Sequence, residues 1–525
     1  MAEGNAKGSS VVLHAFMRAW GVALVEIARA LTPPSRRQLM MLAILFLLVT
    51  AGGLLALLAA MQAAGSGTTY YVDCDAGDNR RAGTSEATAW QTPWSNRAGG
   101  RVLSGGDHLL LKRGCTWGGQ EARIMASGGG PGAMIVIESY GDPALAPPTL
   151  TNADGTTSCR GDCGAMHWDP GVLMRVMGSF VRIEGLRFVG VPPRREEGCE
   201  AQGVGNHSGV WFEGVDGQPA VGNELTRSEV TGMTRGAVIA PTATRTRIHQ
   251  NRFIANTMML SLDEAPANDG GAVGIQVQGS DNEIHHNDFR GHDACSYDYG
   301  RDGSAVEMWG SGSRNDIHHN VSYDNNSFLE FGKPQGAEPP TGNRIAFNRV
   351  VGVDGAAEGQ AFVVTRGAQN RFGPILSTTI SNNSVYLPGG RARGIVCQSG
   401  CGPETLTAIN NIIWSDGDGL ATPFGTIVCD GACEERHNLL WSSDGSPVVS
   451  IGSDRDLGAA LHVNSIVADP GWVDTADLDL RLRPDSPAID AGVVTNDRPP
   501  YRTDQLGMPV PAGERVDIGA FEFQP

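Results

Sequence analysis

Two glutamates occupy equivalent places in two short apolar segments, where their carboxyl groups could transfer protons or bind a cation. Glu307 lies in Val-Glu-Met-Trp, and Glu330 lies in Leu-Glu-Phe, 23 residues further along the chain. Alternate side chains of a β-strand face opposite sides, so the apolar neighbours are expected to face a core and both glutamates to face outward. Aligning the Ile-Gln-Val segment on the glycine that follows it places Gln276 beside Glu307 on the preceding strand.

Carboxylates on stacked strands would be direct neighbours, because such strands lie about 4.8 Å apart. The two charges could share a proton, bind a cation such as Ca²⁺, or be neutralised by Arg301 or Lys333. A separation near 5 Å is also compatible with a retaining glycosidase, in which one carboxylate is the nucleophile and the other group transfers a proton. The alternative is that Glu307 and Glu330 are solvated surface residues.

Three polar segments interrupt the chain around these glutamates, and insertions in a repeat fold tend to surround its binding site. They span residues 263–271, 292–302 and 333–340. The candidate catalytic residues are therefore Glu307, Glu330, Asp302, Arg301 and Lys333. The candidate substrate-binding residues are Gln276, His292, Asp293, Tyr297, Asp298, Tyr299 and Trp309. Acid–base residues in a closed cleft would favour an enzyme, whereas an open row of these aromatic residues would favour a binding protein.

Two histidine pairs, His285-His286 and His318-His319, recur at the same repeat position and raise the question of a metal site. Strand alternation would place the two members of each pair on opposite faces. At most one histidine per pair could then reach a shared site. The pattern favours packed or exposed structural histidines over metal ligands.

The elements that carry these residues form a repeat. The pattern Asn-x-(Ile/Leu)-x-x-Asn ends at Asn287, Asn320 and Asn348 in its clearest copies, and each copy is followed by β-prone residues. Weaker copies end at Leu186, Ser228, Asn251, Asn383, Asn411 and Asn438. Intervals of 23 to 42 residues predict short coils with inserted loops. We expect an all-β parallel β-helix in which the asparagine amides stack as a hydrogen-bonded ladder.

The chain from Thr68 to Pro525 resembles the right-handed parallel β-helix proteins of the pectate-lyase-like superfold. The resemblance rests on segments near both ends of that region. They are Tyr70-Tyr71-Val72, Gly83-Thr84-Ser85, Trp90, Gly106-Asp107, residues 112–117, residues 486–492 and residues 517–522. These motifs imply the architecture and its caps but say little about activity.

The catalytic motifs of the superfold are not matched. Polygalacturonase-like members carry Asn-Thr-Asp, Asp-Asp and Gly-His-Gly, of which Gly291-His292-Asp293 is only a partial counterpart. Pectate-lyase-like members use a basic residue opposite Ca²⁺ held by acidic side chains. Lys333 and Arg301 are the candidates for that residue, but neither lies in a family motif, so no catalytic role is carried over.

The N-terminal residues predict a membrane anchor. Leu39–Met61 is an uncharged run of 23 residues, long enough to span a bilayer core of about 30 Å, and Arg36 and Arg37 precede it. The positive-inside rule then places the N-terminus in the cytoplasm. Residues 10–31 form an expected amphipathic helix that could lie on the membrane or contact a membrane-protein partner. A cleaved signal peptide is the alternative.

The expected domain order follows from these observations. It comprises a cytoplasmic segment (1–37), a transmembrane helix (38–62), a linker (63–67), an N-terminal cap with the first coils (68–150), coils with inserted loops (151–445) and a C-terminal capping segment (446–525).

The net charge limits the kinds of partner that the protein can bind, and the cysteines indicate the redox state of its compartment. The formal net charge is −17, which argues against a nucleic-acid partner because such proteins need a basic surface. All ten cysteines lie beyond residue 70, and three pairs share one spacing: Cys159/Cys163, Cys397/Cys401 and Cys429/Cys433. No histidine accompanies these pairs at zinc-ligand spacing, so disulfides in an oxidising compartment are expected.

The sequence predicts a membrane-anchored β-helix that lies in the periplasm or outside the cell and acts on a cell-surface or exported polysaccharide, as a lyase or a glycoside hydrolase. A non-catalytic glycan-binding or scaffold protein and a structural surface protein are the alternatives. The fold alone does not separate them, since one solenoid architecture can host all three.

The predicted topology can be tested with a reporter that fluoresces only in the cytoplasm, fused after Pro525. The fusion should stay dark, because Arg36 and Arg37 hold the N-terminal side of the anchor in the cytoplasm. Replacing both arginines with glutamate is the matched control and should weaken this preference. Bright fusions of the unmodified chain would contradict the orientation.

Overall fold

The computed structural model describes most of the chain beyond residue 66. The described residues are 67–93, 103–118, 121–152, 171–190, 207–261, 269–296, 300–353, 360–417, 425–431, 433–446, 448–451, 464–495 and 501–524. The predictions for the cytoplasmic segment, the amphipathic helix and the transmembrane helix lie outside these residues. Within them, no helix is long and apolar enough to cross a membrane.

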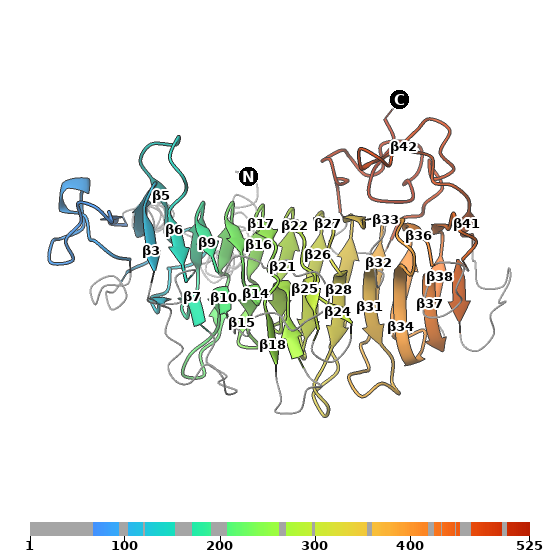
Figure 1. Ribbon diagram of the computed structural model, residues 1–525, viewed down its shortest axis with the longest axis horizontal. Helices are drawn as coiled ribbons and strands as arrows, with labels where there is room; N and C mark the ends of the chain where they lie inside the picture. Colours follow the sequence, from blue (N-terminus) through green and yellow to red (C-terminus); the bar gives the residue numbers. More distant parts are fainter. Residues whose placement is uncertain are drawn as a thin grey trace, which may run out of the picture. The chain divides into compact units, whose positions relative to one another are not determined.

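Three parallel sheets run along the solenoid, and each coil contributes one strand to each sheet in turn (Figure 1). Sheet I is built from β1 (Thr69–Val72), β2 (His108–Lys112), β5 (Ile135–Tyr140), β8 (Val181–Glu184), β12 (Glu224–Thr226), β16 (Arg247–His249), β21 (Glu283–His285), β26 (Asp316–His318), β29 (Arg344–Ala346), β32 (Thr378–Ser381), β35 (Leu406–Ile409) and β38 (Glu434–Arg436).

Sheet II follows sheet I after a short corner. It is built from β3 (Thr116–Gly118), β6 (Thr149–Thr151), β9 (Arg187–Val189), β13 (Glu229–Thr231), β17 (Arg252–Ile254), β22 (Asp288–Arg290), β27 (Val321–Tyr323), β30 (Arg349–Val351), β33 (Ser384–Leu387), β36 (Ile412–Ser415), β39 (Leu439–Trp441) and β41 (Ile466–Val467).

Sheet III closes each coil and carries the two glutamates. It is built from β4 (Ala122–Ile124), β7 (Gly171–Val176), β10 (His207–Phe212), β14 (Arg235–Ile239), β20 (Val273–Val277), β25 (Ser304–Trp309), β28 (Ser327–Gly332), β31 (Ala361–Arg366), β34 (Arg393–Cys401), β37 (Gly425–Gly431) and β40 (Val449–Ile451).

The remaining elements are small. They are the 3-10 helix η1 (Glu86–Thr88), the parallel pair β11 (Ala220–Val221) and β15 (Ala243–Thr244), and the hairpins β18 (Met259–Ser261) with β19 (Asp269–Gly271), β23 (Ala294–Cys295) with β24 (Arg301–Asp302), and β42 (Trp472–Asp474) with β43 (Asp479–Leu482). The all-β solenoid class predicted from the repeat is confirmed.

A buried asparagine ladder connects successive coils at the corner between sheets I and II. The Nδ2 of Asn320 donates to Oδ1 of Asn348 over 3.0 Å, and the Nδ2 of Asn287 donates to Oδ1 of Asn320 over 3.0 Å. The same contact links the ladder from Asn251 to Asn438 in unbroken order. The ladder and its register were predicted correctly, because these amides are buried and must find hydrogen-bond partners inside the protein.

The residue just before each ladder asparagine has a positive φ although it is not glycine. Gln250 (58°), His286 (56°), His319 (55°) and Phe347 (52°) share this left-handed conformation. Together with the ladder asparagine that follows, it turns the chain from sheet I into sheet II within two residues. The conformation is unfavourable for an L-residue with a β-carbon, so the hydrogen bonds of the ladder must stabilise it.

The C-terminal segment packs along the side of the coils. The ring of Trp472 stacks on Trp414 of sheet II with 6.0 Å between ring centroids, and both contact Tyr386. Leu480, Ile518 and other buried residues complete a second apolar cluster, separate from the interior of the coils. In Figure 1 this red segment lies beside β33, β36 and β41.

Disulfides fix both ends of the described solenoid. Cys397–Cys401 and Cys429–Cys433 are bonded as expected from their spacing, and Cys74 is bonded to Cys115. Cys295 is also disulfide-bonded, and no described cysteine is free. The prediction of oxidised cysteines is therefore confirmed for these residues, whereas Cys159/Cys163 lies outside the described ones.

The ladder should be a main source of stability. Asn320→Ala removes the amide that donates to the Ile284 carbonyl and accepts from the Asn287 backbone N–H, leaving buried groups without partners. We expect a loss of about 3 kcal/mol in the free energy of unfolding, measured by urea denaturation. Gln369→Ala, at an exposed amide outside the ladder, is the control and should change it by less than about 0.5 kcal/mol. Equal losses in both variants would contradict a special role for the ladder.

Candidate functional site

The predicted column of polar side chains exists on sheet III. Gln276 of β20 pairs in register with Glu307 of β25, which pairs with Glu330 of β28. The Nε2 of Gln276 donates to Oε2 of Glu307 over 3.1 Å. Val306, Met308, Leu329 and Phe331 are buried in the core, so strand alternation turns both glutamates to the outer face as expected.

Arg366 compensates one of the two carboxylates. It lies in β31, two residues beyond the partner of Glu330, and its guanidinium donates to Oε1 of Glu330 and to the Phe331 carbonyl. The same guanidinium lies 5.5 Å from the ring centroid of Trp309, and Phe372 lies 5.1 Å from that ring. Trp309 is therefore packed against protein groups and is not an open stacking surface.

Glu307 has the electrostatic properties of a proton donor. Burial raises its pKa, and the neighbouring charge of Glu330 raises it further, to about 7. The charges of Arg235 and Arg366 and the hydrogen bond from Gln276 oppose the rise without cancelling it. Near neutral pH, Glu307 is therefore partly protonated, next to a carboxylate that is bound to a guanidinium.

The three insertions lie at both ends of these strands. The β18–β19 hairpin precedes β20 and the β23–β24 hairpin precedes β25, so both arise at the amino ends of the strands that carry Gln276 and Glu307. Residues 333–340 follow β28 and therefore leave from its carboxyl end, beyond Glu330.

Arg301 and Lys333, the sequence candidates for a cation near the glutamates, have contacts elsewhere in the structure. The guanidinium of Arg301 holds both carboxylate oxygens of Asp293 at 2.8 and 2.9 Å, and Lys333 is buried with its backbone N–H bound to the Phe372 carbonyl. The carboxylate of Asp302 accepts from the Gly303 N–H. The compensating cation is Arg366 because β31 follows directly in the sheet.

His292, a sequence candidate for substrate contact, is not a surface residue. Its side chain is fully buried, with Nδ1 2.9 Å from Oδ1 of Asn325 and Nε2 3.1 Å from Nδ2 of Asn256. The ring belongs to a polar ladder at the corner that leads toward sheet III. Tyr297, Asp298 and Tyr299 lie outside the described residues.

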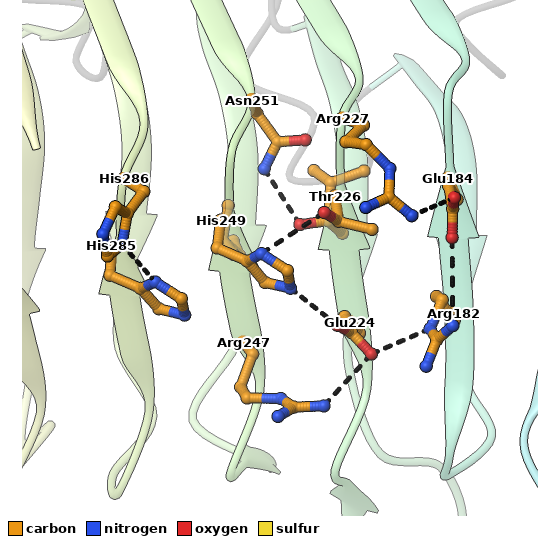
Figure 2. Close-up of polar contacts among 12 residues, drawn as sticks. Arg182, Glu184, Glu224, Thr226, Arg227, Arg247, His249, Asn251, His285 and His286 are labelled. Atoms are coloured by element: carbon orange, nitrogen blue, oxygen red, sulfur yellow. Dashed lines mark hydrogen bonds and ion pairs between the residues drawn. The ribbon is translucent and has the colours of Figure 1, made fainter. Parts of the chain in front are cut away.

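A second polar array covers sheet I. Figure 2 shows Glu224 surrounded by the guanidinium groups of Arg182 and Arg247, at 3.0 and 3.1 Å, and by Nε2 of His249, at 2.6 Å. Although burial raises the pKa of Glu224, these partners lower it to about 2. A carboxylate so fully neutralised stays ionised, and it suits a structural ion-pair network better than proton transfer.

The histidine pairs of sheet I do not alternate faces, contrary to the prediction. The Nδ1 atoms of His285 and His286 lie 2.8 Å apart, and those of His318 and His319 lie 2.7 Å apart. The reason is the left-handed conformation of His286 and His319, because strand alternation ends at a corner residue.

The described residues at the carboxylate column do not fit a Ca²⁺ site. Calcium takes six to eight oxygen ligands, but only two carboxylates meet here and one of them is bound to Arg366. Elsewhere among the described residues, Asp73, Cys74, Asp75 and Cys115 have ligand atoms close enough for a shared ion. Because Cys74 and Cys115 are bonded to each other, this cluster lacks thiolate ligands.

Comparison with known proteins finds one short sequence match and structures with a similar fold. No protein-family model matches the chain. Over 87 residues, 17% of this chain, it is 36% identical to a lacto-N-biosidase of Bifidobacterium longum subsp. longum. The match spans only 5% of that relative's length.

Solved structures match the solenoid over a much longer range. Pectate lyase Pel9A superposes with a TM-score of 0.50 at 15% identity, covering 88% of this chain and 98% of that one. The chain has a pectate-lyase-like parallel β-helix fold. A GH136 lacto-N-biosidase from Eubacterium ramulus gives a TM-score of 0.49 at 13% identity, covering 77% of this chain and 67% of that one.

Sequence reasoning missed Arg235, Arg366 and Phe372. Arg366 could have been found by extending the alignment one coil further, since Val364 continues the column of Glu330 and Arg366 is the next outward residue of that strand. Arg235 and Phe372 carry no comparable pattern, because their positions depend on how the intervening loops fold.

The raised pKa of Glu307 predicts a specific pH dependence of stability. Between the ordinary pKa of 4.5 and the folded value of about 7, the folded protein binds more protons at this site than the unfolded chain. Its contribution to stability is full below pH 4.5 and is lost as the pH rises through 7. Glu307→Gln removes this loss, so its melting temperature relative to the unmodified protein should rise between pH 4.5 and 8.

The control for this measurement is Glu338→Gln, because Glu338 is an exposed glutamate in the third insertion. Its melting temperature should follow that of the unmodified protein across the same pH range. If the difference between Glu307→Gln and the unmodified protein does not change with pH, the pKa of Glu307 is not raised.

Proposed function

We propose that the chain is a carbohydrate-active hydrolase whose catalytic pair is Glu307 and Glu330 on sheet III. The observation that carries the proposal is the difference between these two carboxyl groups. Burial and the neighbouring charge keep Glu307 partly protonated, while the guanidinium of Arg366 is bound to the carboxylate of Glu330. A carboxyl group with a raised pKa next to a second carboxyl group is the arrangement that acid–base catalysis of glycoside hydrolysis requires.

Like charges also face each other elsewhere on this solenoid: on sheet I, Glu283 pairs with Asp316, where His318 contacts the first carboxylate and Arg344 binds the second. On sheet I, Glu224 lies between Arg182 and Arg247, and on sheet II, Arg187 and Arg252 both bind Glu229. Columns of alternating sign stabilise stacked strands, whereas facing carboxylates destabilise them. At Glu307, burial and the facing charge of Glu330 raise the pKa, and this supports a functional role over a solvated surface.

The strand spacing favours a retaining reaction. Carboxyl groups about 5 Å apart leave no room for a water molecule between nucleophile and sugar. The Glu330 carboxylate would attack the anomeric carbon while the glycosidic C–O bond breaks and Glu307 gives its proton to the leaving oxygen. A water molecule would then give a proton to Glu307 and displace Glu330, which restores both groups.

The substrate class is proposed from the shape of the sheet and from similar proteins. A row of parallel strands presents an extended face that suits a linear polymer, and the chain is similar to proteins described as a lacto-N-biosidase and a pectate lyase. With the expected anchor at residues 38–62, the substrate would be a cell-surface or exported polysaccharide. A non-catalytic glycan-binding role is the alternative, since the same extended face could bind a linear polymer without cleaving it.

The test is an assay of the full chain, solubilised in detergent, against a panel of polysaccharides. Release of reducing ends should accompany binding, and Glu307→Gln and Glu330→Gln should each lower the rate at least about 100-fold, because each removes a proton-transferring or nucleophilic group. Glu338→Gln is the control and should keep full activity. Absorbance near 235 nm, which reports unsaturated products, should stay flat; its rise would indicate a lyase instead.

A rescue experiment separates the two glutamates. In Glu330→Ala, azide can replace the missing carboxylate as nucleophile and should restore turnover with a glycosyl azide as product. In Glu307→Ala, azide should restore the second step only for substrates with a good leaving group. Binding without product release by the unmodified protein would support the non-catalytic alternative.

A further inference from the structure

The two histidine pairs of sheet I form a repeated geometry that the hydrolase site does not use. In each pair the imidazole rings are nearly perpendicular, at 85° and 86°, and their Nδ1 atoms face each other. Equivalent rings stack on neighbouring coils: His285 lies 5.0 Å from His318, and His286 lies 5.1 Å from His319. The pairs exist because a left-handed corner residue brings its side chain back to the face of the preceding strand.

The Nε2 atoms of His318 and His319 already have hydrogen-bond partners. The Nε2 of His318 lies 3.1 Å from the carboxylate of Glu283, and the Nε2 of His319 lies 2.9 Å from the Thr503 carbonyl. An ionised carboxylate and a carbonyl only accept hydrogen bonds, so both Nε2 atoms carry the proton. In neutral rings, both Nδ1 atoms then present lone pairs to each other across 2.7 Å. A cation that both lone pairs can reach, either a shared proton or a metal ion beside the line that joins them, would relieve this repulsion.

We propose that His318 and His319 bind a divalent first-row transition-metal ion through their facing Nδ1 atoms. Metal-bound histidines usually donate the other ring N–H to a carboxylate or a backbone carbonyl, which are the two partners observed for this pair. Metal–nitrogen bonds of about 2.1 Å spanning the 2.7 Å gap enclose an angle of roughly 80°. Such an angle suits the square or octahedral geometry of Cu²⁺ or Ni²⁺ better than tetrahedral zinc.

The neighbouring coils limit the site. Only two successive coils carry a histidine pair at this corner among the described residues: His285 with His286, and His318 with His319. On the coil before them the corner residue is Gln250, and on the coil after them it is Phe347. No third carboxylate, histidine or cysteine ligand atom joins the pair among the described residues. The remaining ligands would therefore be water molecules.

Metal binding would also affect the C-terminal segment. The ring of Tyr501 lies 5.2 Å from His318 and 5.8 Å from His319, and Thr503 accepts the hydrogen bond from His319. An ion that fixes the two rings would fix these contacts, so the segment around Tyr501 should become harder to cleave when the ion is bound.

The test uses the full chain in detergent, freed of metal with a chelator and titrated with Cu²⁺. We expect binding by calorimetry and an electron paramagnetic resonance spectrum with coupling to two imidazole nitrogens per bound ion. His318→Ala and His319→Ala should each lower the affinity at least about 10-fold. Cu²⁺ should slow limited proteolysis near Tyr501 in the unmodified protein but not in His319→Ala.

The matched control is His249→Ala. This residue stacks on His285 at 4.7 Å and belongs to the same column, but its neighbour is Gln250, so the change removes an imidazole without breaking a pair. It should leave Cu²⁺ affinity unchanged. Two-nitrogen coupling in the unmodified protein shows that a histidine pair binds the ion even if a variant fails to fold, and the pair variants show which pair it is.

Three results would overturn the proposal. They are the absence of Cu²⁺ binding, a bound ion without two-nitrogen coupling, and an affinity that survives both pair variants but is lost in His285→Ala/His286→Ala. In the first case the pair holds a shared proton only, and in the third the ion lies on the preceding coil. None of these results bears on the hydrolase proposal, whose residues lie on sheet III.

Discussion

The register between coils is the constraint on which the rest of the structure depends, and the buried asparagine ladder sets it. Each amide donates to the next asparagine and accepts from the backbone of the previous one, so a shift by one residue would break every contact in the column. A parallel β-helix has no hairpins to fix its register and needs such a device. Since side chains alternate with a period of two, the ladder also decides which residues face outward on all three sheets.

Because the register is fixed, outward side chains of successive coils stack in columns. The charges within each column must therefore be compensated locally. Sheets I and II do so by alternating arginine with glutamate, as at Arg182, Glu224 and Arg247. Sheet III places Glu307 against Glu330 and compensates only one of them, through Arg366 on the following strand. The remaining cost appears as the raised pKa of Glu307. The same architecture therefore carries a network of ion pairs on sheet I and a carboxyl group with a raised pKa on sheet III.

The sequence was sufficient to predict those features that follow directly from the repeat. The Asn-x-Ile-x-x-Asn pattern predicted the stacking from Leu186 to Asn438, and alternation then placed Gln276, Glu307 and Glu330 side by side. The cation bound to Glu330 was not among the sequence candidates, because Arg301 and Lys333 are close in sequence, whereas Arg366 is close through the sheet. His292 was misplaced because polar residues at inner corners join ladders and are buried, although their residue type suggests the surface.

Side chains stop alternating between the two faces at the corners of the coil, and this produces the histidine pairs of sheet I. His286 and His319 follow strand residues and would face away from them if the strand continued. Their left-handed backbone reverses the direction instead, and the ladder asparagine that follows holds them in it. A conformation that favours the turn thus brings two imidazoles together on each of two coils. The interaction that stacks the coils also builds the histidine pairs, with no residue dedicated to placing them.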